Sequence, residues 1–391
     1  MNKLFLIIVI IFGTYFLSYG QSIKQNTQSD TLQVDSIAPD TLSKFAQFNK
    51  KAEALFKVLP FPMVSYSTET GTVFGLAKYN LVNLVKSDTV SSASSFSELI
   101  SLSTEGQFKI VLGSTVYLNK NKIILQGEVQ YIEYPEWILG VGNNVKRENA
   151  ERIKTTRVVF NNKLLFAINK KKTLYAGIIQ EYKNYLKVDA YDSTESFLNK
   201  TKYPGYQGGI TSGFGIAARY DTRDHKYNAR TGFFAATNVK AFSTYVGSDF
   251  TYNSFELDIR KFFNPWLKHV IAFQVYTKAN LGTVPFYSLG KIGGTDRMRG
   301  YYLGAIRDKV IADSQIEYRM PIWSIFGITA FASAGRVAEN YSDMSLDGLW
   351  YAGGLGLRIL VDSSNRANLR IDFGYGMEDS KTIVVGFTEA F

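Results

Sequence analysis

The chain has 391 residues, 15% aromatic residues, no cysteine and a formal net charge of +10. The lack of cysteine excludes disulfide bonds and thiolate metal sites. Lys and Arg residues are scattered along the chain and line no recognisable binding module, which argues against nucleic acid as a partner.

The aromatic content comes from 25 Tyr and 28 Phe residues, yet the mean hydropathy is near zero. Strands that alternate apolar and polar residues produce this combination, which is typical of a transmembrane β-barrel. Helices and strands do not alternate along the sequence, so an α/β enzyme fold is not expected.

Residues 1–20 have the pattern of a signal peptide. Lys3 supplies the positive start, Leu4 to Leu17 form the apolar stretch, and a cleavage site precedes Gln21. No later run of about 18 apolar residues would hold the chain in an inner membrane. The sequence therefore predicts export to the outer membrane of a Gram-negative bacterium, where basic residues face anionic lipids including lipopolysaccharide.

Residues 21–59 are predicted to form a periplasmic linker with a short amphipathic helix. The first half of this segment is polar, and residues 41–58 have helical spacing of apolar residues. Such a helix packs at the periplasmic rim, lies on the inner leaflet or plugs the pore, and the sequence leaves these alternatives open. Residues 60–391 follow as the predicted barrel.

The barrel region reads as one alternating strand after another, about sixteen in all. We predict an all-β fold, a transmembrane antiparallel β-barrel whose long loops face the outside. The longer connections cover 135–150, 188–206 and 283–306. The clearest strands cover 108–119, 123–134, 173–187, 208–220, 232–245, 251–263, 310–320, 325–337 and 381–391.

The first and last strands would meet in a seam. The first, residues 64–70, is short and polar and should pair weakly; we place Tyr66 at the seam. In the last strand Gly386 can kink the backbone, and Phe387 and Phe391 are expected on the lipid-facing side.

A glycine-rich loop with a central arginine precedes residues 310–320. Its motif residues are Gly293, Gly294, Arg299, Gly300 and Tyr301. Glycines allow close backbone approach, and a confined guanidinium needs an acidic partner. The loop is therefore predicted to fold into the lumen.

The two strands after this loop supply the predicted inner wall. Glu317 falls on the lumen-facing side of the first strand and is the predicted partner of Arg299. Phe331, Ser333 and Gly335 fall on the lumen-facing side of the second.

These residues resemble the motifs of the BamA/TamA family of outer-membrane assembly factors and their two-partner-secretion relatives. Arg299-Gly300-Tyr301 resembles the family's Arg-Gly-Phe/Tyr loop, and 331–335 its Phe-x-Asp-x-Gly strand. The segment 220–224, with Gly232 beyond it, is similar to another recurring family segment. The resemblance implies a sixteen-stranded barrel, an internal loop and a seam that opens toward lipid.

Two departures from the family pattern affect the expected function. Ser333 stands where the family has an aspartate, so we expect Arg299 to depend on Glu317 alone or on water. The segment 21–59 is too short for a polypeptide-transport-associated domain, so the chain is expected to be a barrel-only member.

The leading hypothesis is a protein that helps insert or translocate client outer-membrane proteins, or lipids, through the seam. The alternatives are a passive pore and a non-catalytic scaffold within a homo-oligomer or a larger assembly complex. The sequence contains no nucleophile elbow, no phosphate loop and no metal-ligand spacing, so no enzymatic activity, cofactor or metal is expected.

Overall fold

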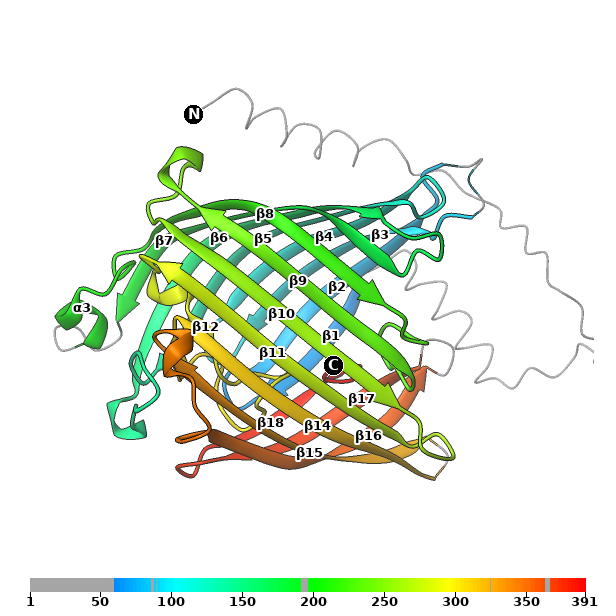
Figure 1. Ribbon diagram of the computed structural model, residues 1–391. Coiled ribbons are helices and arrows are strands. Elements are labelled where there is room, and N and C mark those ends of the chain that lie inside the picture. Colours follow the sequence, from blue (N-terminus) through cyan, green and yellow to red (C-terminus); the bar gives the residue numbers. More distant parts are fainter. Residues whose placement is uncertain (1–59, 86–87, 89, 191–195, 324, 363–365) are drawn as a thin grey trace, which may run out of the picture. The chain divides into compact units, whose positions relative to one another are not determined.

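The computed structural model describes residues 60–85, 88, 90–190, 196–323, 325–362 and 366–391 (Figure 1). These residues form a closed antiparallel barrel of sixteen strands, which confirms the predicted fold class and strand number. Consecutive strands pair around the wall, except that β11 pairs directly with β14. The predicted signal peptide and helical linker lie outside the described residues.

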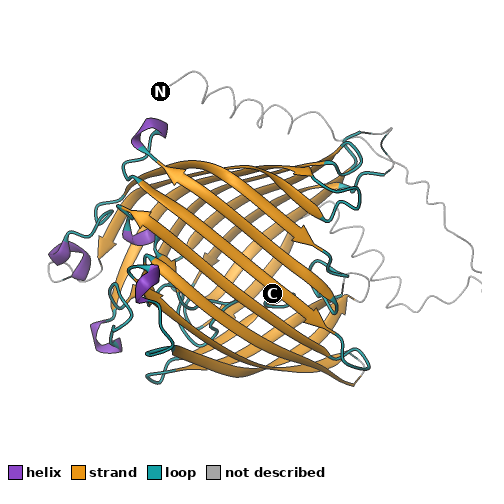
Figure 2. Ribbon diagram, in the orientation of Figure 1, coloured by secondary structure: helices purple, strands orange, loops and turns teal. Residues whose placement is uncertain are grey.

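The wall strands follow chain order, and short helices occur in the connections (Figure 2). The strands are β1 (Phe61–Ser67), β2 (Gly71–Val82), β3 (Ser94–Ser103), β4 (Phe108–Leu118), β5 (Ile123–Ile138), β6 (Glu151–Ala167), β7 (Leu174–Ala190), β8 (Gly209–Asp221), β9 (Gly232–Phe242), β10 (Tyr252–Phe263), β11 (Val270–Gly282), β14 (Val310–Trp323), β15 (Phe326–Ala338), β16 (Trp350–Asp362), β17 (Ala367–Gly376) and β18 (Lys381–Phe387). The short helices are α3 (Phe197–Thr201), η2 (Arg147–Asn149), η4 (Thr244–Val246), η5 (Phe286–Ser288) and η6 (Tyr341–Asp343).

Period-two alternation assigns the two faces of the wall. On β14, Asp313 and Glu317 are buried inside the barrel, whereas Ile316 between them is 41% exposed on the outer side. On β8, Phe214 and Ile216 are likewise more than half exposed on the outer face. An apolar outer face beside a polar inner face is the pattern of a barrel surrounded by lipid.

The connections differ between the two ends of the barrel. One end, which we call the long-loop end, carries the connections β5–β6, β7–β8 and β11–β14; the other carries the start of β1 and the end of β18. No helix in the described part of the chain has the length and apolar character to cross a membrane.

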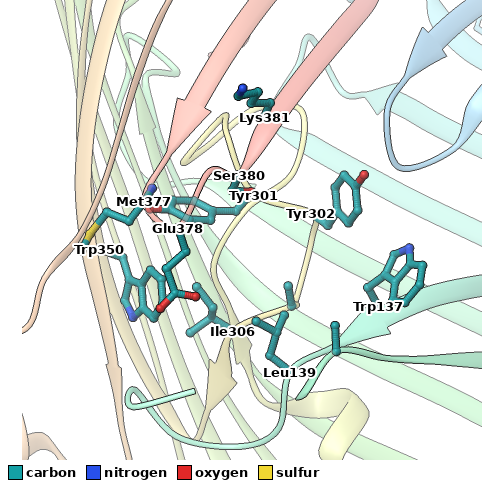
Figure 3. Close-up of a pocket in the computed structure, with 12 residues that line it drawn as sticks. Trp137, Leu139, Tyr301, Tyr302, Ile306, Trp350, Met377, Glu378, Ser380 and Lys381 are labelled. Carbon is teal, nitrogen blue, oxygen red and sulfur yellow. Dashed lines mark hydrogen bonds between the residues drawn. The ribbon is translucent and has the colours of Figure 1, made fainter. Parts of the chain in front are cut away.

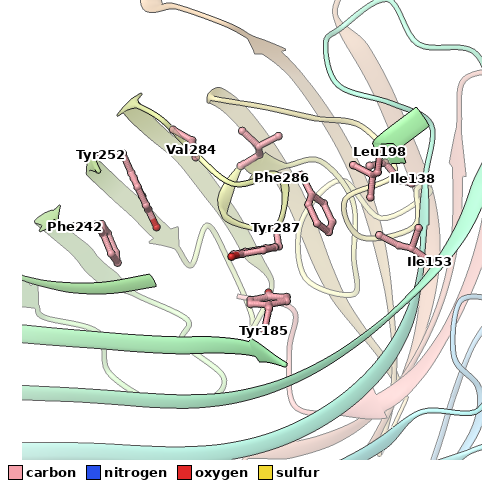
Figure 4. Close-up of a cluster of buried hydrophobic side chains, with 10 residues drawn as sticks. Ile138, Ile153, Tyr185, Leu198, Phe242, Tyr252, Val284, Phe286 and Tyr287 are labelled. Atoms are coloured by element: carbon pink, nitrogen blue, oxygen red, sulfur yellow. The ribbon is translucent and has the colours of Figure 1, made fainter. Parts of the chain in front are cut away.

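A cluster of buried apolar side chains supports the base of the β11–β14 connection (Figure 4). Tyr287 in η5 stacks on Tyr185 of β7, with ring centroids 3.6 Å apart. Phe286 is fully buried beside it, and Leu198 of α3 reaches the same cluster. This packing fixes where the connection enters the barrel.

The seam strands differ in extent from the predictions. β1 runs from Phe61 to Ser67, three residues earlier than expected, and β18 ends at Phe387 instead of Phe391. The backbone at Thr388 adopts a left-handed conformation with φ of 67°, which turns the chain out of the strand.

Candidate functional site: the lumen loop and the strand seam

The connection between β11 and β14 folds back into the barrel. Its arms pair as the short strands β12 (Gly290–Lys291) and β13 (Arg307–Asp308). Between them, residues 292–306 form the segment that we call the lumen loop. Gly294 donates its N–H to the Tyr301 carbonyl oxygen at 3.0 Å, so the glycine pair Gly293-Gly294 closes the neck of the loop.

Arg299, near the tip of the lumen loop, is fully buried against the inner wall. Its Nη2 donates to Glu317 Oε2 on β14 at 2.5 Å, and its Nη1 donates to Asp372 Oδ2 on β17 at 2.7 Å. The guanidinium carbon lies 3.7 Å from the centre of the Phe331 ring on β15. One arginine thus holds three strands through two carboxylates and an aromatic face.

The expectation that Arg299 relies on Glu317 alone is wrong, because Asp372 provides a second carboxylate. Ser333 makes no ion pair; its hydroxyl donates to the Ala352 carbonyl oxygen at 3.2 Å. The acidic group absent from β15 is therefore replaced by one from β17. Gly335 lies beside Asp313, where an added Cβ would come 2.7 Å from the Asp313 Cβ.

The Arg299 pair belongs to a larger buried network that sequence reasoning missed. Arg358 on β16 donates to Asp372 Oδ1 at 2.6 Å and to Glu389 Oε2 at 2.7 Å. Arg319 donates to Glu317 Oε1 at 2.7 Å. The alternation of Arg370 and Asp372 with apolar residues in β17 was the available signal for inward charges.

Glycines let the lumen loop lie directly on the β17 backbone. Gly300 has a φ of 144°, and an added Cβ would come 2.7 Å from the Tyr375 carbonyl carbon. A Cβ on Gly374 would come 2.5 Å from the Arg299 carbonyl oxygen. Side chains at these two positions would separate Arg299 from its carboxylates.

Tyr301 binds the loop to β16 and to the turn between β17 and β18. Its hydroxyl donates to the Tyr351 carbonyl oxygen at 2.6 Å and accepts the Met377 N–H at 2.6 Å. Its ring packs edge-on against Trp350.

The short strands β12 and β13 at the base of the loop are bound to β5, and the loop makes a second ion pair with β14. Arg307 and Lys291 each donate to Glu136 Oε2 on β5 at 2.9 Å. Arg297 pairs with Asp313 on β14 and lies over the Tyr276 ring. The β11–β14 connection is therefore anchored to β5 as well as to β14 and β17.

The seam between β1 and β18 is short. Among the described residues, its register includes Tyr66 opposite Val385 and Ser67 opposite Val384, and no further pair. Phe387, the last residue of β18, pairs with Leu369 of β17, and the register of the described residues gives it no partner in β1. Gly386 has open space beside it: apart from its chain neighbours, no atom of the described residues lies within 4 Å of an added Cβ.

The prediction that Phe391 faces lipid in the last strand is wrong. After the turn at Thr388 the chain enters the barrel, and Phe391 packs near Phe262 with 7% of its surface exposed. Arg319 Nη2 donates to the Phe391 carbonyl oxygen at 2.9 Å. The buried pairing of Glu389 with Arg358 holds this inward path.

Two cavities adjoin the loop and the inner wall. One, of about 260 Å³, is lined by aromatic residues including Trp137, Tyr301 and Trp350 and by the β17–β18 turn (Figure 3). The other, of about 400 Å³, is polar and lies along β3 to β10. Within the described residues no group of His, Asp or Glu is arranged to hold a metal ion.

The site and wall together define a transmembrane barrel with an internal, ion-paired loop and a short seam. Residues 85–387 match the Omp85 superfamily domain. The chain therefore belongs to the Omp85 superfamily of outer-membrane β-barrels, in agreement with the motif resemblance described above.

Solved structures share the fold at low sequence identity. BamA from Haemophilus ducreyi lacking POTRA domains 1–3 has a TM-score of 0.57 and 16% identity, covering 83% of this chain and 69% of that one. CdiB from Acinetobacter baumannii has a TM-score of 0.54 and 13% identity, covering 85% and 60%. CdiB from Escherichia coli has a TM-score of 0.55 and 10% identity, covering 83% and 62%. A comparison with curated proteins found no match.

Proposed function

We propose that this chain assists the insertion or translocation of client proteins, or of lipids, at the outer membrane through the β1–β18 seam. The observation that carries the proposal is the short register of that seam, two residue pairs against seven between β17 and β18 and seven between β1 and β2. Each missing pair leaves backbone N–H and C=O groups of an edge strand free to pair with an incoming strand.

Fewer ladder hydrogen bonds also make the seam the least costly place to part the wall. A net contribution of about 0.5–1.5 kcal/mol per hydrogen bond favours separation at β1–β18 over separation at any longer register. The strand edges exposed in this way would template a client strand by β-augmentation.

The cellular setting is part of the proposal. The chain would be exported with cleavage of residues 1–20 and would act, without enzymatic activity, in the outer membrane of a Gram-negative bacterium, among lipids that include lipopolysaccharide. Its partners would be client outer-membrane proteins. Residues 21–59 would form the periplasmic linker, and a homo-oligomer or a larger assembly complex is the proposed context.

A disulfide across the seam tests the proposal, because the chain has no native cysteine. Tyr66→Cys with Val385→Cys joins directly opposed residues. In cells that carry this variant, we expect the oxidised form to lower the amounts of client proteins in the outer membrane and the reduced form to restore them. Quantitative mass spectrometry of the membrane fraction provides the readout.

The matched control joins two strands that should not part. Leu355→Cys with Phe373→Cys places a second disulfide across opposed, outward-facing residues of β16 and β17. Oxidation of the control should leave the outer-membrane proteins unchanged. Unchanged amounts with the locked seam as well would contradict a role for seam opening.

The polar cavity favours passive passage of small solutes as a second candidate function. Small or polar side chains, including Ser97, Ser114 and Thr115, line it and leave about 400 Å³ unfilled. The amide oxygens of Asn161 and Asn238 are buried without a partner in the described part of the chain. Ion conductance across planar bilayers tests this candidate. Steady conductance that is unchanged after deletion of 284–306 would favour the pore. Conductance that appears only after that deletion would favour a plugged lumen.

A further inference from the structure

The lumen loop touches both sides of the seam, and we propose that its residues 300–303 act as a clasp that holds the seam closed at the long-loop end. Glu69 is the contact on the β1 side, and Ser380 and Met377 are the contacts on the β18 side. This inference rests on the proposed function, because it names what regulates the same seam. It goes further than the ion pairs of Arg299 with Glu317 and Asp372, which we call the Arg299 lock. The lock binds the loop to β14 and β17 and does not reach β1.

The β1 side of the clasp is a carboxylate in the turn between β1 and β2. Glu69 Oε2 accepts the Leu303 N–H at 3.0 Å, and Glu69 Oε1 accepts the Tyr134 hydroxyl of β5 at 2.9 Å. Both carboxylate oxygens are thus engaged. Burial raises the pKa of Glu69, against the opposing effect of these two hydrogen bonds.

The β18 side of the clasp is the turn between β17 and β18. Ser380 Oγ donates to the Gly300 carbonyl oxygen at 2.6 Å, and the Met377 N–H donates to Tyr301 Oη at 2.6 Å. Figure 3 shows Tyr301, Met377 and Ser380 gathered at this turn. Leu303, which contacts Glu69, follows three residues after Gly300, which contacts Ser380.

The clasp adds substantially to a seam that pairs weakly by itself. Beyond the two register pairs, the direct contacts at this end include Thr68 N–H to the Ile383 carbonyl oxygen at 3.2 Å. Separating the turn at Glu69 from the turn at Ser380 would require the loop to release one of them. The loop itself stays in place, because Arg299 is bound to Glu317 and Asp372.

Glu69 is the side that should release first. On the β18 side, two hydrogen bonds from the β17–β18 turn and the Arg299–Asp372 ion pair on β17 all hold the loop. The β1 hairpin is joined to the loop through the Glu69 carboxylate. Loss of that carboxylate should free the β1 hairpin and leave the loop seated.

A single cysteine at a buried seam position measures how often the seam opens. Val384 of β18 is 4% exposed and lies opposite Ser67, so Val384→Cys reacts with a water-soluble maleimide when the strands separate. In the full chain reconstituted in lipid vesicles, the labelling rate reports the open fraction. We expect Glu69→Ala to raise this rate about tenfold, the effect of losing a hydrogen bond to a charged acceptor.

Three further variants distinguish loss of the clasp from a general destabilisation of the barrel. Tyr134→Phe removes the other hydrogen bond to Glu69 and should change the rate little. Glu105→Ala removes a carboxylate from the β3–β4 turn, where it pairs with Arg152, and should also change it little. Glu69→Gln keeps the shape of the side chain and should give a smaller increase than Glu69→Ala.

The clasp makes a specific prediction for a double variant. Glu69 and Ser380 act in series on one bridge, so Ser380→Ala should add nothing once Glu69 is Ala. Heat-modifiable migration on gels shows that each variant is folded; if Glu69→Ala fails this check, Glu69→Gln carries the same comparison. Labelling that stays at the parent rate, or single effects that multiply in the double variant, would overturn the clasp.

The labelling assay uses no client protein, so it stands apart from the test of the proposed function. If the seam disulfide leaves the outer-membrane proteins unchanged while Glu69→Ala speeds labelling, the proposed function fails and the clasp remains. If the disulfide blocks assembly and Glu69→Ala has no effect on labelling, the function stands and the clasp is rejected.

Discussion

Arg299 Nη1 lies 2.7 Å from the carboxylate of Asp372, a residue 73 positions further along the chain. Ser333 provides no carboxylate to Arg299, and Asp372 supplies a second one beside that of Glu317. The contact with Asp372 also ties the loop to the strand next to β18, so that the lock and the seam lie on adjacent parts of the wall.

Substitution of Asp372 tests this replacement. Asp372→Asn leaves the buried guanidinium groups of Arg299 and Arg358 short of a carboxylate, and we expect a loss of about 3–5 kcal/mol in the free energy of unfolding. Urea-induced unfolding in lipid vesicles measures it. Ser333→Ala is the comparison; it removes one hydroxyl hydrogen bond and should cost about 1 kcal/mol. A cost for Ser333→Ala as large as that for Asp372→Asn would contradict the assignment.

The close approach of the loop to β17 depends on Gly300. Gly300→Ala adds a Cβ that would lie 2.7 Å from a backbone carbon, at a φ of 144°. We expect the loop to leave the lumen and trypsin to cleave after Arg297 and Arg299 at least tenfold faster than in the parent, because a buried peptide bond must first be exposed. Gly386→Ala, where space is open, should leave cleavage slow; equal protection in both variants would show that the glycine is not required.

The inward path of the C-terminal residues predicts a packing role for Phe391. Phe391→Ala should lower the free energy of unfolding by about 3 kcal/mol, the cost of removing a buried aromatic ring. Tyr245, 98% exposed in η4, provides a comparison whose change to Ala should cost no more than about 0.5 kcal/mol. Unfolding curves that coincide for the two variants would place Phe391 outside the core.

Asp224, in the connection between β8 and β9, predicts a dependence on pH. Burial alone would raise the pKa of Asp224, but the Arg366 guanidinium and the N–H groups of Thr231 and Arg230 outweigh it and lower the pKa. A carboxyl whose pKa is lower in the folded chain stabilises that state above its ordinary pKa of about 4, and this contribution disappears as the pH falls through the lowered value.

The measurement compares thermal unfolding of the parent and of Asp224→Asn across pH. The variant should unfold at a lower temperature at pH 7, and the difference should shrink as the pH drops below about 4. A difference that stays constant with pH would mean that the charge of Asp224 does not contribute.

The local pattern of the sequence was enough to predict the strands of the wall and one of the two ion pairs of Arg299, the pair with Glu317. Period-two alternation placed Glu317 and Phe331 inside the barrel, because side chains of successive strand residues point to opposite faces whatever surrounds them. Glycines around Arg299 indicated a confined loop for an equally local reason, the freedom of the glycine backbone.

Other features depended on which strands meet in space. Asp372 has the same alternation signal as Glu317, but its role follows from β17 lying under the loop tip, which no local pattern specifies. The path of Phe391 turns on a left-handed backbone at Thr388, an uncommon conformation for a β-branched residue. Tyr66 lies in the first strand as predicted, but its partner across the seam, Val385, is known only from the register of the closed barrel.

By itself, then, the sequence determined the alternating strands, the direction of their side chains and the presence of a confined arginine, since these depend on residues close together in the chain. The tertiary structure decided the partners. It brought Asp372 to Arg299, Glu389 to Arg358 and Glu69 to Leu303, because closing the barrel joins segments that are far apart in sequence and sets the register between them.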